Sequence, residues 1–351
     1  MRDLRVMGQT GTPKLISVLG GAPAKRPPIW MMRQAGRHLP EYLELRSRAK
    51  NFLEFCYTPS MATEATLQPI RRYGMDGAIL FADILLILDA MGLGVEFEKG
   101  VGPIVQQIEA ASDLGKVPAI KAADRLGPVY ETVSRVKAEL PKEAALIGFA
   151  GSPWTVSLYA IEGRGKTDKS LAWRWAHGRS DELAAVMDYV IEATAHYLVR
   201  QVEAGADALM LFDSWAEGLP DNIFREVIIR PTTKLVAMLR DMGVTVPITG
   251  FPRGAGAMLP EYARVTGVTA VGLDTAAVPL FVNTALPEGM PVQGHLDPLL
   301  LIEGGERLDA RVRELVEAYA GRPHIFNLGH GVRPETPIAN VERVLKIVRE
   351  G

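Results

Sequence analysis

The chain has 351 residues, 48% of them hydrophobic, and a formal net charge of −2, so it can bury a large core as one large domain or two ordinary ones. Its basic residues are scattered, which excludes the concentrated positive surface that binds nucleic acid. No apolar run reaches the length of a signal peptide or a membrane span, and the single cysteine, Cys56, can form neither an internal disulfide nor a metal site by itself. We therefore expect a cytoplasmic protein with no membrane partner.

Eight short apolar runs of strand length recur along the chain, and each is followed by sequence of helical character. In order they are Pro28–Met32, Gly77–Phe81, Ala144–Ala150, Ala208–Phe212, Val244–Thr249, Ala270–Leu273, Pro291–Gln293 and His324–Phe326. Strands this apolar are buried on both faces, as in a parallel sheet with helical crossovers. Eight such units predict an α/β fold, a single (β/α)8 TIM barrel over residues 1–351 with residues 1–12 flexible. An open doubly wound sheet is the alternative, but no GxGxxG motif lies between a strand and a helix.

Helix starts are indicated where a capping residue precedes a first-turn proline, as in Thr58–Pro59, Ser152–Pro153 and Thr336–Pro337. A further helix is predicted around Phe224–Met242. The segment Leu85–Pro118 has no sustained periodicity and is expected to be a loop.

Polar side chains stand at or just after the ends of the predicted strands, and in a barrel these ends converge on one mouth. They are Arg33, Arg37, Asp83, Tyr159, Ser214, Asp274, His295, Asp297 and His330. Some have an equally good structural interpretation: Asp213 or Asp274 can cap a helix, Tyr159 can face the core, and His295 can satisfy a loop carbonyl. Both interpretations stay open for Asp274 and His295.

Two arginines, Arg33 and Arg37, follow the first apolar run four residues apart. A guanidinium offers five donors in a planar fork and stays charged, so a pair of them suits a ligand with several carboxylates or phosphates. Taken alone, two such residues are more often ordinary surface arginines.

The motifs carry more information than the spacing does. They are PIWMMRQAGRHLPEY, LQPIRRYGMDGAILFADIL, GFAGSPWTVSLYAIEG, LFDSW, VGLD, QGHLDP and HIFNLGHG. In this order, and over nearly the whole chain, they resemble the uroporphyrinogen decarboxylase family of tetrapyrrole biosynthesis.

The resemblance implies a (β/α)8 homodimer without cofactor or metal that removes the carboxyl groups of the four acetate side chains of uroporphyrinogen III to give coproporphyrinogen III. By motif, it places the catalytic groups at Asp83 and Arg33. The implied substrate-binding residues are Arg33, Gln34, Arg37, Asp83, Tyr159, Phe212, Ser214 and His330. The chain departs from the family pattern at His38, Ala82, Glu217 and His295, and we expect Glu217 to point away from the mouth.

The residues support this chemistry independently at one position above all. Asp83 is a lone acid between an apolar strand and an apolar helix, where a buried carboxylate can accept from several pyrrole N–H groups and offset positive charge. Two alternatives remain. One is a corrinoid- or zinc-dependent methyltransferase of the same superfamily, although one cysteine without an HxC motif is a poor zinc site. The other is a tetrapyrrole-binding barrel without activity.

Overall fold

The computed structural model describes residues 11–98, 101–165 and 168–350. Most of the segment predicted to be flexible, residues 1–12, therefore lies outside the described residues.

Seven parallel strands form one curled sheet in the order β1-β4-β5-β6-β7-β8-β9. The strands are β1 (Gly77–Ile79), β4 (Ala145–Gly151), β5 (Ala208–Asp213), β6 (Ile248–Pro252), β7 (Ala270–Gly272), β8 (Val292–Gln293) and β9 (His324–Ile325). All of their residues are buried, as the apolar runs predicted for a sheet covered on both faces.

The predicted first strand, Pro28–Met32, fills the eighth position of the barrel without becoming a regular strand. Ile29 makes only an isolated parallel bridge to Phe326. The Phe326 N–H donates to the Pro28 carbonyl at 2.9 Å, and on the other side the Asp76 N–H donates to the Ile29 carbonyl at 2.9 Å. Pro28 has no N–H to offer, which limits the ladder that this segment can make. The barrel prediction is confirmed, with a bridge in place of one strand.

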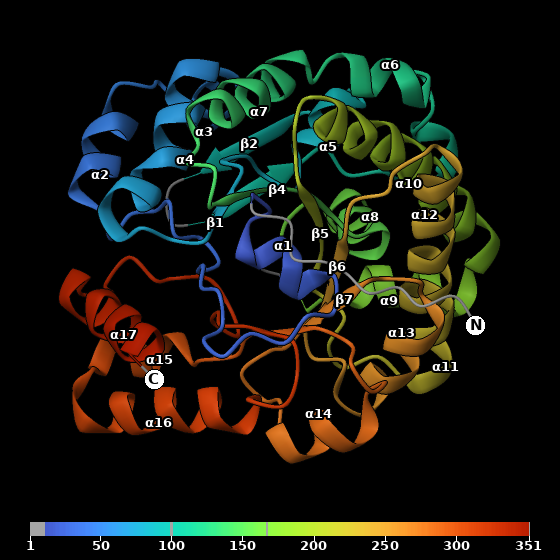
Figure 1. Ribbon diagram of the computed structural model, residues 1–351. Coiled ribbons are helices and arrows are strands. Elements are labelled where there is room, and N and C mark those ends of the chain that lie inside the picture. The colour runs from blue at the N-terminus through green and yellow to red at the C-terminus, as the bar shows by residue number, and fades with distance from the viewer. Residues whose placement is uncertain (1–10, 99–100, 166–167, 351) are drawn as a thin grey trace.

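Helices surround this sheet, as Figure 1 shows in a view with α1 in front of the barrel centre. Those of the first half are α1 (Lys14–Leu19), α2 (Pro40–Ser47), α3 (Phe52–Tyr57), α4 (Pro59–Tyr73), α5 (Leu86–Ala90), α6 (Ala119–Asp124), α7 (Gly127–Glu139), α8 (Pro153–Glu162) and α9 (Ser170–Gly178). Those of the second half are α10 (Ser180–Glu203), α11 (Asp221–Phe224), α12 (Arg230–Asp241), α13 (Leu259–Val265), α14 (Pro279–Ala285), α15 (Pro298–Glu303), α16 (Gly305–Ala318) and α17 (Ile338–Glu350).

Two local predictions were wrong. The segment 85–118 contains α5 and an antiparallel hairpin, β2 (Val95–Glu98) with β3 (Gly102–Val105), rather than only loop. The fifth predicted strand begins at Ile248 instead of Val244. The helix predicted around Phe224–Met242 is confirmed, and it contains a π-helical segment, Arg225–Ile229, between α11 and α12.

The capping predictions place two helix starts correctly but assign the wrong hydrogen bonds. Thr58 and Ser152 precede α4 and α8, yet neither side chain caps its helix. The Thr58 hydroxyl donates instead to the Glu54 carbonyl of the preceding helix at 2.6 Å. The Ser152 hydroxyl is buried and has no hydrogen-bond partner among the described residues.

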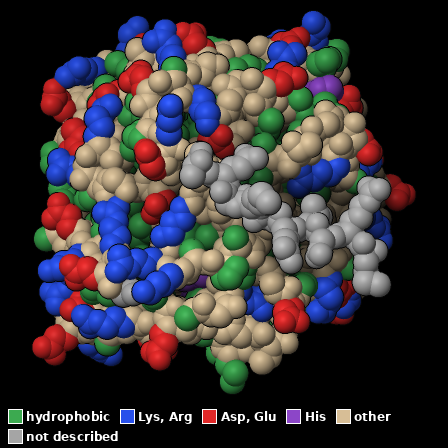
Figure 2. Space-filling view, viewed as in Figure 1, with side chains coloured by type: hydrophobic (Ala, Val, Ile, Leu, Met, Phe, Trp, Pro, Cys, Tyr) green, Lys and Arg blue, Asp and Glu red, His purple; other side chains and the backbone are tan. Residues whose placement is uncertain are grey.

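Side chains fill the inside of the barrel, so a ligand can bind only at one of its ends. The Trp30 indole N–H donates to Gln293 Oε1 at 2.9 Å, and the Gln293 amide reaches the Met210 sulfur at 3.6 Å. Helix α1 covers the amino ends of the strands, where its Leu15 lies against Gly77, the first residue of β1. A Cβ added at Gly77 would lie 2.8 Å from the Leu15 Cδ1. In the same view, Figure 2 shows Lys and Arg interspersed with Asp and Glu, as expected from the near-zero net charge.

Candidate active site

The carboxyl ends of the strands bring most of the predicted site residues to one end of the barrel. Asp83 follows β1, Tyr159 lies in α8 after β4, and His330 follows β9. Arg33 follows the bridge at Ile29 and connects these three, because its charge acts on the pKa of Asp83, of Tyr159 and of His330. Residues separated by up to three hundred positions therefore share one electrostatic environment.

Asp83 belongs to this group as a carboxylate with few partners. Burial raises its pKa, while the Leu85 N–H and the Arg33 charge lower it. Its Oδ1 accepts the Leu85 N–H at 2.9 Å, which fixes the carboxylate in the turn ahead of α5. A carboxylate held in this way is poorly solvated and gains strongly from a cation or from N–H donors brought by a ligand.

Arg33 combines an unusual backbone conformation with a guanidinium that is not engaged in the fold. Its φ is 60°, in the left-handed region that costs a non-glycine residue about 1 kcal/mol. Its aliphatic stem lies against Gly331, where a Cβ would come within 2.4 Å of the Arg33 Cδ. The guanidinium is exposed and makes no hydrogen bond or ion pair within the described residues. A donor fork whose charge reaches Asp83 is thus available to a ligand.

Arg37 and Gln34 belong to the same loop as Arg33, but the Arg37 side chain is exposed and the Gln34 side chain is buried. The charge of Arg37 acts on the pKa of Tyr42 rather than on that of Asp83 or His330. Gln34 is only 1% exposed, and its amide donates to the Gly77 carbonyl at 2.9 Å and accepts the Met31 N–H at 3.0 Å. Both ends of the Gln34 side chain serve the fold, so it positions the arginine loop on β1.

Two aromatic side chains contribute apolar surface. Tyr159 is 8% exposed, and its ring meets that of Trp215 edge to face at 6.2 Å. Burial raises the pKa of Tyr159, so its hydroxyl remains a donor at neutral pH. Phe212, at the end of β5, packs edge to face against Phe149 at 5.5 Å and Phe251 at 6.1 Å. Such rings form a wall suited to a flat, partly apolar ligand.

Ser214 lies directly after β5, and two charged residues lie near it, of which Arg253 was not among the predicted site residues. Arg253, directly after β6, donates to the Ser214 carbonyl at 3.1 Å and forms an ion pair with Glu217 at 3.2 Å. Glu217 also pairs with Lys169 at 3.1 Å. The position of Arg253 at a strand end was the available signal.

His330 is neutral at physiological pH. Burial, with the charges of Arg33, Arg253 and Arg333, lowers its pKa to about 4, and Glu217 opposes this shift. Its Nδ1 is buried and has no partner among the described residues, so one ring nitrogen can accept from or donate to a ligand. The charge of Glu217 therefore acts on His330, while the expectation that the Glu217 side chain points away from the mouth stays a prediction.

The comparisons with known proteins show the family to which this chain belongs. The family model of uroporphyrinogen decarboxylase (URO-D) matches residues 10–351. The chain belongs to the uroporphyrinogen decarboxylase family. It is 78% identical over 340 residues to a protein named uroporphyrinogen decarboxylase from Hyphomonas neptunium, covering 97% of this chain and 99% of that one. It is 49% identical over 340 residues to another of that name from Maricaulis maris, covering 96% and 97%.

A methyltransferase from Methanosarcina mazei has a solved structure with the same fold as this chain. The TM-score is 0.80 and the alignment covers 96% of this chain and 97% of that one, at 18% sequence identity. At this identity, the likeness concerns the barrel alone.

Three further candidates have structural roles in this member of the uroporphyrinogen decarboxylase family. Asp274 accepts the Ala276 N–H at 2.8 Å and the Gly254 N–H at 2.7 Å, so it ties two loops together. His295 is buried and its Nε2 lies 3.0 Å from the Tyr319 hydroxyl. Asp297 caps α15 by accepting the Leu299 N–H at 2.8 Å. These contacts differ in detail from the structural interpretation given for Asp274, which was a helix cap, and for His295, which was a hydrogen bond to a loop carbonyl.

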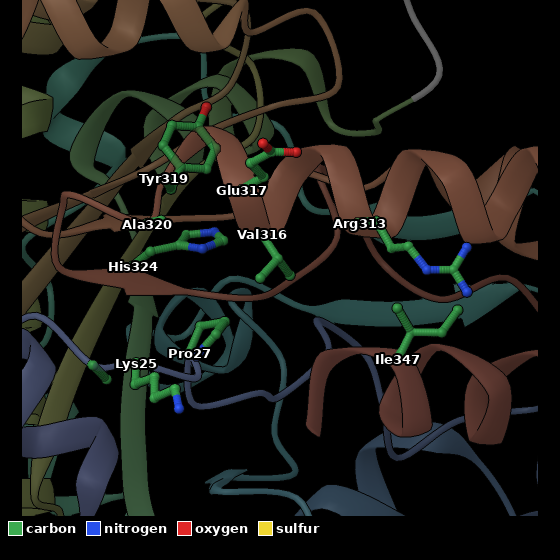
Figure 3. A pocket seen from close by; sticks show the side chains of 10 residues that line it. Lys25, Pro27, Arg313, Val316, Glu317, Tyr319, Ala320, His324 and Ile347 are labelled. Atoms are coloured by element: carbon green, nitrogen blue, oxygen red, sulfur yellow. The ribbon is translucent and has the colours of Figure 1, made fainter. Parts of the chain in front are cut away.

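The described part of the chain contains no group of three or more side chains that could hold a metal ion. It also contains no helix that is long and apolar enough to cross a membrane. A cavity of about 360 Å³ lies at the other end of the barrel, where His324 begins β9. Lys25, Arg313 and Tyr319 also line it, as Figure 3 shows, and none of the predicted site residues does.

Proposed function

We propose that the protein is a carboxy-lyase that converts uroporphyrinogen III to coproporphyrinogen III and CO2 by removing the carboxyl groups of its four acetate side chains. One observation carries the proposal: a partly buried carboxylate, Asp83, feels the charge of the available Arg33 guanidinium at the carboxyl end of the barrel. The names of the relatives with 78% and 49% identity support the same activity.

The substrate can supply its own electron sink. A proton added to the pyrrole carbon next to the acetate-bearing carbon gives an iminium cation. The electron pair of the bond to the carboxylate then neutralises this cation as CO2 leaves, which produces an exocyclic alkene. A proton added to the methylene carbon and the loss of the ring proton complete a methyl group, so one proton replaces each CO2. The chemistry required of the protein is binding, proton transfer and stabilisation of positive charge.

Asp83 suits the last of these tasks. The reduced macrocycle directs its pyrrole N–H groups inward, where a single carboxylate can accept from several of them. The same negative charge offsets the iminium as it forms, and the partly buried position strengthens this attraction. The Leu85 N–H already holds the carboxylate in place in the folded protein, so little reorganisation accompanies the reaction.

In this proposal, most of the other predicted residues bind the periphery of the substrate. Arg33 and Arg37 bind two of its eight carboxylates, with Arg33 in the inner position and Arg37 at the rim. Tyr159, Ser214 and His330 donate hydrogen bonds to acetate or propionate groups, and Phe212 contacts a pyrrole face. A guanidinium with a pKa above about 12 is a poor acid, so Arg33 takes part in proton transfer by orienting the donor.

The test is anaerobic incubation with uroporphyrinogen III, followed by oxidation and chromatography of the porphyrins. We expect products with seven, six, five and finally four carboxyl groups. Unchanged substrate with the wild-type protein, under conditions in which a relative is active, would refute the proposal.

The alternatives give different results in the same assay. A thiol methyltransferase would require zinc, and a chelator would abolish its activity, whereas we expect decarboxylation to be unaffected. Cys56 is also buried inside α3, where it is poorly placed to bind a metal. A barrel that only binds tetrapyrroles would retain the substrate without releasing CO2. Simple binding also gives no reason for a partly buried carboxylate that feels the charge of Arg33.

A cytoplasmic homodimer is part of the proposal. Four exposed apolar side chains follow the neighbouring strands β7 and β8 near the mouth, namely Val278, Leu280, Phe281 and Leu299. Leu280 is 74% exposed, which is unusual for a leucine that remains in water. Light scattering of the purified protein, compared with a Leu280→Glu variant, tests whether this surface pairs two chains.

A further inference from the structure

Asp213 is a buried carboxylate that the proposed chemistry does not use. It is the last residue of β5 and only 1% exposed. Successive side chains of a strand point to opposite faces, so Asp213 points toward the helices while Phe212 and its ring contacts lie on the inner face. Its Oδ1 accepts the hydroxyl of Thr155, in the first turn of α8, at 2.5 Å.

The same hydroxyl connects the carboxylate to the loop after β5. Thr155 Oγ1 accepts the Trp215 N–H at 3.3 Å, and the Trp215 carbonyl accepts the indole N–H of Trp154 at 3.0 Å. The loop that carries Ser214 is thereby attached to the helix that carries Tyr159. Because Thr155 and Tyr159 are four residues apart on α8, they lie on the same side of that helix.

We propose that Asp213 is a positioning residue for the cleft: through Thr155 it holds the Trp215 amide and so fixes Ser214 relative to Tyr159. This inference rests on the proposed function, in which both residues bind the carboxylates of the substrate. A shift of about 1 Å in such a pair can cost about a hundredfold in rate.

The surroundings of Asp213 agree with a role beyond ordinary packing. Its Oδ2 is buried and has no partner among the described residues. Burial raises the pKa of Asp213 to about 7, although the Thr155 hydrogen bond opposes the shift. From α13, Tyr262 faces it, and the Asp213 charge contributes to the raised pKa of that phenol. The ionised Asp213 carboxylate makes a stronger hydrogen bond to Thr155 than the neutral form does, so it holds the loop more firmly as the pH rises through 7.

The experiment compares Asp213→Asn, Asp213→Ala and Thr155→Val in the full chain. We expect Asp213→Ala and Thr155→Val each to lower kcat/KM about tenfold to a hundredfold, mainly through KM, and the double variant to be no worse than the poorer single one. Asp213→Asn retains an acceptor for Thr155 and should keep activity within about fivefold. Its profile of kcat/KM against pH should lack a step near 7 that the wild type shows.

Asp207→Asn is the matched control, because Asp207 precedes the same strand at its opposite end and pairs with Lys137 at 2.6 Å. It should lose stability without a change in KM. Hydrogen exchange of the peptide that contains the Trp215 amide gives a readout independent of activity. We expect faster exchange in Asp213→Ala and Thr155→Val than in Asp207→Asn.

Superimposable pH profiles together with unchanged Trp215 exchange would overturn the role of Asp213. A wild-type protein that forms no decarboxylated product would instead overturn the proposed function, while the exchange data would still decide whether Asp213 holds the loop. If Asp213→Ala does not fold, Asp213→Asn and Thr155→Val retain the comparison.

Discussion

Replacing the Asp83 carboxylate by an amide tests the centre of the proposed mechanism. Asp83→Asn keeps the shape of the side chain and an oxygen for the Leu85 N–H, which Asp83 accepts at 2.9 Å, so the turn should remain intact. What is removed is the negative charge that would face the iminium. Two unit charges about 4 Å apart interact by about 4 kcal/mol at an effective dielectric constant of about 20. That corresponds to about a thousandfold in rate.

The assay is the initial rate of heptacarboxylate porphyrinogen formation under anaerobic conditions, measured together with thermal unfolding. We expect kcat to fall about a hundredfold to a thousandfold, the lower value reflecting screening by water at a half-buried site. Stability should be unchanged or slightly higher, because burial disfavours the charge that is removed.

Asp89→Asn provides the control, since Asp89 is a carboxylate of the adjoining α5 whose Oδ2 accepts the Tyr57 hydroxyl at 2.8 Å. This variant should retain its rate. A normal rate for Asp83→Asn, or a loss matched by an equal loss of stability, would contradict the reasoning.

Three further predictions concern stability and binding. Burial lowers the pKa of His324 from 6.5 to about 4, so the unfolded chain binds a proton at higher pH than the folded protein does. The free energy of unfolding should therefore fall as the pH drops from 6.5 to 4, by up to about 3 kcal/mol from this residue. In chemical denaturation, the free energy of unfolding of His324→Gln should depend less on pH. Gly331→Ala would place a Cβ 2.4 Å from the Arg33 Cδ, so the displaced guanidinium should raise KM about tenfold in steady-state assays. Glu217→Gln removes the ion pair with Arg253 at 3.2 Å, so KM for the polycarboxylate substrate should fall about twofold to fivefold at low salt and less at high salt.

Each of these variants has a control at an ordinary position. His177→Gln changes an exposed histidine, Gly321→Ala adds a Cβ with nothing within 4 Å, and Glu261→Gln removes an ion pair with Arg225 on the surface. A pH dependence unaltered in His324→Gln, a normal KM for Gly331→Ala, or a salt-independent KM change in Glu217→Gln would count against the corresponding argument.

The predictable part of the site was the set of residues that end the strands. Asp83, Tyr159, Ser214 and His330 could be identified because the apolar runs are local, and the topology of a parallel barrel places their carboxyl ends together. Contacts within this end were not predictable. The Arg253–Glu217 ion pair joins two loops of different strands, and no local pattern reports such a contact.

By itself, the sequence determined the period of strands and helices and the residue types at each strand end, because a run of a few apolar residues and its bounding turn carry that information. Only the tertiary structure decided what those side chains do. It assigned both ends of the Gln34 amide to the backbone, left the Arg33 guanidinium available, and reduced the predicted first strand to a bridge at Ile29. These outcomes depend on barrel closure, which joins Ile29 to Phe326 and brings together groups that are distant along the chain.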